Sequence, residues 1–291
     1  MSNSALNIEK YVGTGNDFII VDGSQTMAAE ILGLHRAEAV RRICHRQLGA
    51  GADGLIFLDR KKKDTFSWEF YNSNGSTAKM CGNATRCVGR WAFRNHGLYK
   101  LDLMTAVGLV RIEADEHEVT SYLEYLKLGF KEFAAESDGK RTVATFVNTG
   151  VPHAVIELDT IDRASSVEMR KIINAFRFHP GAGSEGTNVT FLQRDPGGSK
   201  QGELLLTTTT FERGVEGFTL SCGTGVLAAA AVTLRMAQVS DAGLPQIICK
   251  VKTPGGELTV RYGTRWEGAS LMGPADFIYG ARISSEFFDS I

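Results

Sequence analysis

The sequence predicts an α+β fold built from two pseudo-symmetric halves, each a sheet around one central helix. Apolar and β-branched runs bounded by glycine, asparagine or aspartate recur along the chain and are typical of strands. Few segments have helical periodicity, and two of them begin at a Cys-Gly dipeptide, one at Cys81 and one at Cys222. The 291 residues suffice for two medium domains. We expect an N-terminal half of residues 1–131 with 276–291 and a C-terminal half of residues 132–275.

Each element of the first half follows from a local pattern. Strands are expected at residues 18–21, 55–58 and 66–72, and as a series of short strands over 100–131. Residues 28–47 are rich in alanine, leucine, glutamate and arginine, with apolar positions three and four apart, which predicts a helix. A second helix is expected from about residue 82 to 95, with Gly97 as the residue that ends it.

The second half repeats this order of elements. Strands are expected at residues 144–148, 189–192 and 204–211, and a helix at about 165–177. The helix that follows Cys222 is apolar on every side from residue 226 to 232, which predicts that it is buried all round. Residues 253–257, Thr-Pro-Gly-Gly-Glu, predict a hairpin turn.

Ordered similarities between the halves favour an internal duplication. The dipeptide at 15–16, Gly-Asn, corresponds to Thr-Asn at 187–188, each before an apolar strand. Asn72 corresponds to Glu212, each after an aromatic residue, and a helix-starting cysteine follows nine or ten residues later. Two copies related by a pseudo-twofold axis would direct both helix N-termini at one cleft.

A thiol at a helix N-terminus is favoured as an anion, because the partial positive charge and the unpaired N–H groups there lower a cysteine pKa below its free value of about 8.5. Two such thiols, Cys81 and Cys222, suit inversion of a stereocentre: one removes a proton from one face and the other delivers a proton to the opposite face. Because the reaction exchanges their protonation states, the thiols need comparable basicity, which a duplicated unit would supply. The alternative is that both are small core residues.

Charge that develops on a substrate carboxylate needs oriented donors. Helix N-termini provide backbone N–H groups, and small residues there allow close approach. Gly82 and Asn83 after the first cysteine, and Gly223 and Thr224 after the second, are the candidates. The α-carbon of an amino acid is a weak acid, so this preorganisation must supply much of the reduction in the barrier.

A series of short motifs runs in order along nearly the whole chain. They are Gly15-Asn16-Asp17-Phe18, Gly51-Ala52-Asp53-Gly54-Leu55-Ile56, Asn72 with Gly75-Ser76, Cys81-Gly82-Asn83 with Arg86-Cys87, Pro152-His153, Glu185-Gly186-Thr187-Asn188, Glu212-Arg213-Gly214-Val215, Cys222-Gly223-Thr224-Gly225 and Pro254-Gly255-Gly256. Together they resemble the diaminopimelate epimerase family, two-cysteine enzymes that work without pyridoxal phosphate.

The resemblance implies a fold of two halves, each a curved, mostly antiparallel sheet wrapped around a central helix. It implies a cofactor-independent epimerase that interconverts LL- and meso-2,6-diaminopimelate in lysine and peptidoglycan precursor biosynthesis, with Cys81 and Cys222 as the acid and base. The substrate is then a small-molecule amino acid, and the resemblance is compatible with a homodimer. The residues implied to hold the distal amino-acid end of the substrate are Asn16, Asn72, Asn188, Glu212 and Arg213. The backbone at 82–83 and 223–224 would hold the reacting carboxylate.

Three positions depart from the family's pattern. Val151 stands where the family usually has asparagine before Pro-His, Gly217-Phe218 stand where an acidic residue is usual, and Ala84 replaces a common glycine. A lost hydrogen bond to a charged group costs about 1.5–3 kcal/mol. Val151 and Phe218 leave open a racemase for another amino acid, such as histidine. A non-catalytic ligand-binding relative is a further alternative, against which the presence of both thiols argues.

Composition argues against several classes of protein and of site. A net charge of −1 does not indicate binding to nucleic acid or to an anionic membrane. No apolar run reaches the length of about 18 residues that a membrane-spanning helix needs. The N-terminus has no signal-peptide pattern. Five cysteines, an odd number, favour free thiols in a reducing cytoplasm. The spacing of Cys81 and Cys87 is poor for zinc, so no metal site is expected, and Cys44, Cys87 and Cys249 are expected in the core.

Several of the remaining candidates have a structural alternative. Asn16 and Asn188 could cap turns. Glu212 and Arg213 could form a surface ion pair, and as strand neighbours they would both face one ligand only if the chain turned just after them. His153 is expected to support a loop rather than to act in catalysis.

Overall fold

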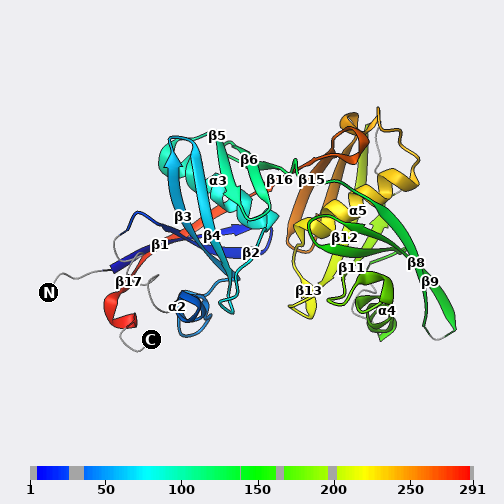
Figure 1. Ribbon diagram of the computed structural model, residues 1–291, viewed down its shortest axis with the longest axis horizontal. Coiled ribbons are helices and arrows are strands. Elements are labelled where there is room, and N and C mark those ends of the chain that lie inside the picture. Colours follow the sequence, from blue (N-terminus) through cyan, green and yellow to red (C-terminus); the bar gives the residue numbers. More distant parts are fainter. Residues whose placement is uncertain (1–4, 26–35, 138, 162–166, 196–201, 289–291) are drawn as a thin grey trace. The chain divides into compact units, whose positions relative to one another are not determined.

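A computed structural model describes residues 5–25, 36–137, 139–161, 167–195 and 202–288 of the chain (Figure 1). The chain divides into two compact units, residues 1–121 with 273–291 and residues 122–272. The division into functional halves at residues 131/132 and 275/276 stays a prediction. Within the described ranges, no helix combines the length and apolar character needed to cross a bilayer.

The described residues of the N-terminal unit form a mixed sheet with the helices α2 and α3 (Figure 1). Its elements are β1 (Ala5–Gly13), β2 (Asn16–Asp22), α2 (Arg36–Cys44), β3 (Gly54–Lys62), β4 (Thr65–Asn72), α3 (Gly82–His96), β5 (Lys100–Thr105), β6 (Gly108–Ala114), β7 (Glu118–Tyr122), β17 (Asp276–Ser284) and the 3₁₀ turn η4 (Ser285–Phe288). Antiparallel ladders join β17 to β1, β1 to β2, β3 to β4 and β5 to β6. Parallel ladders join β2 to β3 and β4 to β5.

The C-terminal unit has the same architecture (Figure 1). Its elements are β8 (Phe130–Ser137), β9 (Lys140–Asn148), β10 (Pro152–Glu157), α4 (Val167–Arg177), η1 (Pro180–Ala182), β11 (Asn188–Arg194), β12 (Glu203–Glu212), β13 (Gly217–Thr219), α5 (Gly223–Met236), η2 (Leu244–Gln246), β14 (Ile248–Thr253), β15 (Gly256–Tyr262), η3 (Thr264–Trp266) and β16 (Ala269–Pro274). Parallel ladders join β10 to β11 and β12 to β14; antiparallel ladders join β8 to β9, β9 to β10, β11 to β12, β12 to β13, β14 to β15 and β15 to β16.

The two units share one order of elements and ladders, which confirms the predicted α+β fold of two similar halves. The N-terminal unit has the order β1, β2, α2, β3, β4, α3, β5 and β6. The C-terminal unit has the order β9, β10, α4, β11, β12, α5, β14 and β15, with the short strand β13 added between β12 and α5 and with short 3₁₀ turns. Each series pairs its strands as antiparallel, parallel, antiparallel, parallel and antiparallel. The series therefore aligns α3 with α5, and β4 with β12.

This alignment supports part of the predicted repeat and corrects another part. Asn72 and Glu212 are the last residues of β4 and β12 and therefore correspond, as predicted. Asn16 and Asn188 do not correspond, because Asn16 begins β2 whereas Asn188 begins β11, the counterpart of β3. The counterpart of Asn188 is Gly54, the first residue of β3. The prediction failed because an asparagine before an apolar run is common to several strand starts.

Each central helix is enclosed by its own sheet. Strands β1, β2, β5, β6 and β17 pack against α3, and strands β9, β10, β11, β12, β14 and β15 pack against α5 (Figure 1). Apart from Thr224, every residue of α5 from Gly223 to Leu234 is buried, which confirms the prediction from its apolar sequence. Helix α3 is buried from Gly82 to Ala92 and ends at Gly97, whose left-handed φ of 63° is one that glycine adopts without strain.

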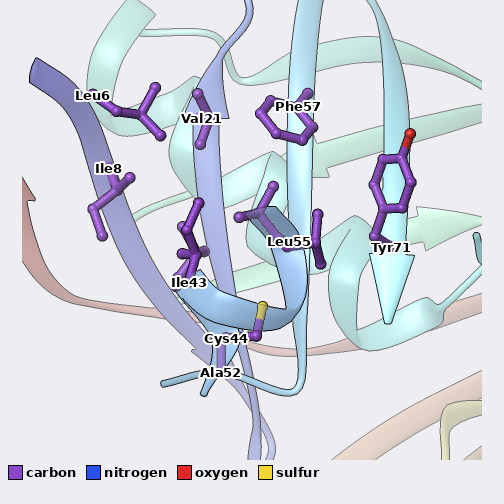
Figure 2. Close-up of a cluster of buried hydrophobic side chains, with 11 residues drawn as sticks. Leu6, Ile8, Val21, Ile43, Cys44, Ala52, Leu55, Phe57 and Tyr71 are labelled. Carbon is purple, nitrogen blue, oxygen red and sulfur yellow. The ribbon is translucent and has the colours of Figure 1, made fainter. Parts of the chain in front are cut away.

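A second core lies between α2 and strands β1 to β4. Val21, Ile43 and Leu55 are among its buried side chains, and Figure 2 shows Ile43 of α2 in one cluster with Val21 of β2 and Leu55 of β3. The helix expected over 28–47 is α2, although residues 26–35 lie outside the described ranges. Residues 45–47 leave the helix because the loop at 49–51 folds back onto its end: the Ala50 N–H donates to the Ile43 carbonyl, at 2.9 Å.

Candidate functional site

Cys81 and Cys222 hold equivalent positions, one at the N-terminus of each central helix. Each is the N-cap residue with an extended backbone, at φ −152° and ψ 121° for Cys81 and φ −114° and ψ 105° for Cys222. Their carbonyls accept the first helical hydrogen bonds, from Thr85 at 3.0 Å and Val226 at 2.9 Å. Both sulfurs therefore lie at the positive end of a helix, next to N–H groups that the helix itself does not pair.

The remaining three cysteines have a different environment. Cys44, Cys87 and Cys249 are buried in the cores of their units, as predicted. Burial raises the pKa of the Cys44 and Cys249 thiols to about 12, and it raises that of Cys87 further. At neutral pH these three thiols keep their protons. Cys81 is half-buried, and Cys222 is buried, with an exposed fraction of 8%. The interpretation of all five cysteines as inert core residues therefore does not fit Cys81.

A chain of amides leads away from the first turn of α3. The Asn83 Nδ2 donates to Asn16 Oδ1 at 2.6 Å, and the Asn16 Nδ2 donates to Asp53 Oδ2 at 3.1 Å. Arg46 then donates to both Asp53 and Asp17. Asn16 thus has both ends of its amide engaged inside the N-terminal unit, and it orients Asn83 beside Cys81.

Asp17 anchors this network to the sheet. Burial acts to raise the pKa of its carboxyl, but hydrogen bonds from Arg46 and Lys10 outweigh burial and hold the pKa at about 2. The Lys10 Nζ lies 2.8 Å from Asp17 Oδ2, and Arg46 binds both carboxylate oxygens, at 2.8 and 2.9 Å. The carboxylate is therefore ionised at any pH at which the protein would work.

Arg86, which follows Cys81-Gly82-Asn83 in the same motif, lies beneath the same helix turn. Its side chain is fully buried, and the guanidinium donates to the Gly82 carbonyl at 3.2 Å, to Thr14 Oγ1 at 2.8 Å and to Asn83 Oδ1 at 2.8 Å. Its Nε has no hydrogen-bond partner in the described part of the chain. These three acceptors are uncharged, so among the described residues this buried cation has no hydrogen bond to a carboxylate.

In the C-terminal unit a line of polar side chains starts at Cys222. Its Sγ lies 3.4 Å from Thr224 Oγ1, which lies 3.0 Å from His153 Nε2. The His153 Nδ1 is 2.8 Å from Thr190 Oγ1, which in turn is 3.1 Å from the hydroxyl of Thr210. We call this line, Cys222–Thr224–His153–Thr190–Thr210, the hydroxyl–imidazole relay. Sequence reasoning missed it because its members come from four separate elements.

The tautomer of His153 follows from its neighbours. The Asn188 Oδ1 accepts from the Arg213 N–H at 2.8 Å, so the Asn188 Nδ2 faces His153 Nε2, at 3.3 Å. Nε2 is therefore an acceptor and Nδ1 carries the proton, which it donates to Thr190. Burial, with the charge of Arg213, lowers the pKa of His153 to about 3 and keeps the ring neutral. The Thr224 hydroxyl can then donate to the imidazole and accept from the Cys222 thiol, or donate to a thiolate instead.

The chain turns directly after Glu212 and Arg213. Gly214 has a φ of 88°, and the Glu216 N–H donates to the Glu212 carbonyl at 2.8 Å, which closes the turn. Adjacent strand residues can face one ligand only if the chain turns just after them, and the chain turns here after Glu212 and Arg213. Arg213 pairs with Glu185, at 3.0 Å, rather than with Glu212, whose carboxylate accepts from the hydroxyl of Thr219.

The other predicted residues lie at the ends of their elements. Asn72 is exposed at the end of β4, where its Nδ2 donates to Ser76 Oγ at 3.0 Å. Gly82 and Gly223 are buried first residues of α3 and α5, and Thr224 is half-buried. The N-terminal unit thus joins Asn16 to Asn83 at the first cysteine, and the C-terminal unit joins Asn188 to Arg213 beside the relay. Among the residues that the structure describes, no group of three or more His, Cys, Asp or Glu side chains is arranged to hold a metal ion.

Comparison with known proteins agrees with these features. Residues 8–125 and 145–278 match the family model described as diaminopimelate epimerase. The chain is similar to the diaminopimelate epimerase of Hydrogenobaculum sp. strain Y04AAS1, with 35% identity over 97% of this chain and 99% of the relative. It is also similar to that of Aquifex aeolicus strain VF5, with 32% identity over 96% of this chain and 98% of the relative.

The fold agrees as well. A crystal structure of a hydroxyproline epimerase from Agrobacterium vitis superposes with a TM-score of 0.68 over 97% of this chain and 93% of that chain, at 13% identity. At that identity the likeness shows the fold alone. The family match and the relatives go further, because they extend over nearly the whole sequence. The chain belongs to the diaminopimelate epimerase family and is an isomerase.

Proposed function

We propose that this protein is a cofactor-independent epimerase that interconverts LL- and meso-2,6-diaminopimelate, a step in the synthesis of lysine and peptidoglycan precursors. The observation that carries the proposal is the equivalent placement of Cys81 and Cys222, each as the N-cap of the central helix in units of the same topology. The names of the full-length relatives support the choice of substrate. A cytoplasmic location and a homodimer remain expectations.

The reaction uses the two thiols as base and acid. The thiolate of one cysteine removes the α-proton, and the electron pair passes into the carboxylate-stabilised carbanion. The thiol of the other cysteine then protonates the opposite face, so that the proton lost and the proton gained balance. Each turnover leaves the protonation states exchanged. Both sulfurs must reach the same α-carbon, one from each side.

Backbone N–H groups would stabilise the charge on the reacting carboxylate. Those of Gly82 and Asn83 on α3, and of Gly223 and Thr224 on α5, lie in first helical turns, where they are not used by the helix. Donors already in place cost no reorganisation when charge develops. A tenfold rate effect corresponds to about 1.4 kcal/mol of barrier, so a few such donors supply several powers of ten.

The distal amino-acid end of the substrate would be held by side chains. We assign this role to Asn16, Asn72, Asn188, Glu212 and Arg213. The guanidinium of Arg213 can pair with a carboxylate through two hydrogen bonds, and Glu212 can bind an ammonium group. For Arg213 this means exchanging Glu185, an exposed partner, for the substrate.

Proton exchange at the α-carbon tests the proposal. In deuterated water, wild-type protein should convert LL- to meso-diaminopimelate with incorporation of deuterium from solvent. Cys81→Ala and Cys222→Ala should each abolish the conversion while the fold is kept. Cys249→Ala, which removes a buried thiol of strand β14 rather than one at a helix start, is the matched control and should keep turnover. Full activity in either Cys81→Ala or Cys222→Ala would refute the two-thiol mechanism.

A racemase for another amino acid is the second candidate. It is favoured by Val151, which lacks the amide usual at that position, and by Phe218, whose ring packs edge-on against Phe211 with 5.7 Å between centroids. The same exchange assay on a panel that includes histidine separates the two candidates. Deuterium incorporation into histidine without any into diaminopimelate would reject the first candidate in favour of the second.

A further inference from the structure

The backbone around the two thiols is duplicated, but the side chains that surround them are not. Helix α3 carries Arg86 five residues after Cys81, and the residue at the same distance after Cys222 on α5 is Leu227. Both side chains are fully buried. Five residues beyond the first cysteine the helix therefore buries a cation, and at the same offset beyond the second it buries an aliphatic side chain.

The polar relay is also confined to one unit. The β2–β3 ladder pairs Phe18 with Gly54, and the β10–β11 ladder pairs His153 with Asn188. Because Gly54 and Asn188 are the first residues of equivalent strands, Phe18 is the counterpart of His153. Phe18 is buried against the ring of Phe70. The N-terminal unit thus has a cation and a phenyl ring where the C-terminal unit has a leucine and a neutral imidazole.

Arg86 is a source of positive potential, because its hydrogen bonds within the described residues all go to uncharged groups. Its hydrogen bonds go to the Gly82 carbonyl, Thr14 and Asn83, all uncharged acceptors. Burial lowers the pKa of Arg86 to about 10, and the thiols of Cys87 and Cys81 act in the opposite direction, so the group stays charged at neutral pH. The coupling between Arg86 and Cys81 is mutual: a thiolate at Cys81 stabilises the guanidinium, and the guanidinium stabilises the thiolate.

The other charged groups do not cancel this difference. In the N-terminal unit, Asp17 of β2 is paired with Lys10 and Arg46. The charges of Asp17 and of Asp276 on β17 help to raise the pKa of Cys87, which stays protonated. In the C-terminal unit, His153 is neutral, Glu212 accepts from Thr219, and Arg213 is 26% exposed and paired with Glu185. Solvent and a counter-ion screen Arg213, whereas Arg86 is fully buried and forms no ion pair with the residues that the structure describes.

We propose that Arg86 sets the resting protonation state of the pair, so that Cys81 is held as the thiolate and Cys222 keeps its proton. Arg86 is a positioning residue for charge, since it acts through Cys81 and does not touch the substrate. The proposal rests on the proposed function, because it takes Cys81 and Cys222 as base and acid. It replaces the expectation that duplication gives the two thiols matched environments.

The test compares the two sulfurs one at a time. In Cys222→Ser protein, alkylation by iodoacetamide at position 81 is followed against pH by mass spectrometry of the tryptic peptide; in Cys81→Ser protein, position 222 is followed. Single-thiol proteins remove the coupling between the two titrations. Cys44, Cys87 and Cys249 are buried and protonated, and they serve as internal unreactive references.

We expect the alkylation midpoint for Cys81 to lie at least about one pH unit below that for Cys222. Arg86→Gln, which keeps hydrogen-bonding capacity but removes the charge, should raise the Cys81 midpoint by about one unit or more, a roughly tenfold loss of rate below the midpoint. Arg86→Lys should restore most of the wild-type profile. In the Cys81→Ser background, Arg86→Gln should leave the Cys222 profile within about twofold, and Leu227→Met is the matched control on α5.

Either of two results would overturn the proposal. One is a Cys222 midpoint at or below that of Cys81 in proteins that keep Arg86, a comparison that does not depend on whether any Arg86 variant folds. The other is a folded Arg86→Gln protein whose Cys81 profile is unchanged. Failure of the proposed function is distinguishable, since it would appear as turnover in Cys81→Ala protein while the alkylation profiles stood as predicted.

Discussion

Acid should destabilise the C-terminal unit through a single histidine. His153 is fully buried, and its two ring nitrogens are engaged by Thr190 on one side and by Thr224 and Asn188 on the other. Burial, with the charge of Arg213, lowers its pKa from 6.5 to about 3. A proton on Nε2 would turn an acceptor into a donor that faces the Asn188 amide, and it would place an unpaired charge in the core.

The sign of the effect follows from which state binds the proton. Below pH 6.5 the unfolded chain protonates this histidine and the folded chain does not, so acid favours unfolding. The stability that neutral His153 contributes is complete above about pH 6.5 and is lost as the pH falls toward about 3. Between pH 7.5 and pH 4.5 the loss covers two units, or about 3 kcal/mol at about 1.4 kcal/mol per unit.

Urea unfolding at the two pH values measures this loss. Trp266 lies in the C-terminal unit and Trp68 and Trp91 in the N-terminal unit, so a background with the latter two replaced by phenylalanine reports on the C-terminal unit. The comparison is with His153→Gln, whose amide stays neutral at both pH values. The parent should lose about 3 kcal/mol more than the variant on acidification. Equal losses in both proteins would refute the argument, because the carboxylates are common to both.

Two further predictions concern the same relay. Thr224→Val should lower kcat/KM by about tenfold or more, because it removes the hydroxyl that can donate to a Cys222 thiolate, a bond worth about 1.5–3 kcal/mol. Thr224→Ser keeps the hydroxyl and should keep most of the activity. Equal activity of the two variants would count against the contact. Gly225→Ala should lower the free energy of unfolding by about 1–3 kcal/mol despite the better helix propensity of alanine, because a Cβ there would lie 2.4 Å from Thr210 Oγ1. Urea unfolding measures the effect of Gly225→Ala, and Ala84→Gly at the equivalent site of α3 is the matched control. A Gly225→Ala protein more stable than the parent would show that the relay residues move to accommodate the new methyl group.

The sequence was sufficient to predict the elements that depend on local pattern. The all-round apolar run after Cys222 predicted a buried helix, and Gly97 predicted where α3 ends. Prediction was less accurate where a contact with a later segment determines the end of a helix. Helix α2 ends at Cys44, before the predicted residue 47, because N–H groups of the loop at 49–51 donate to carbonyls of its last turn. Such a return depends on the path of the chain beyond the helix, which periodicity does not contain.

The candidate site was predictable only in part, for a related reason. The Cys-Gly dipeptides marked both helix starts because an N-terminus has a local signature. The contact of His153 with Thr190 and Thr224 joins strands and a helix far apart in sequence, so no spacing pattern announces it. The same is true of Arg86 and Thr14. From sequence alone, an arginine near a helix start is expected to be exposed. Arg86 is buried because the sheet of its own unit covers this part of α3.

The two units show how a duplicated fold can carry unequal chemistry. Ladder register and helix caps depend on backbone hydrogen bonds and on glycine, so they persist when side chains change. The chemical groups around each thiol depend on side chains alone. Leu227 stands at the position equivalent to Arg86, and Phe18 stands at the position equivalent to His153. A buried charge and a buried imidazole act strongly because little solvent screens them. A pair of such exchanges is therefore enough to make two geometrically equivalent thiols differ in proton affinity without any change in the frame that presents them.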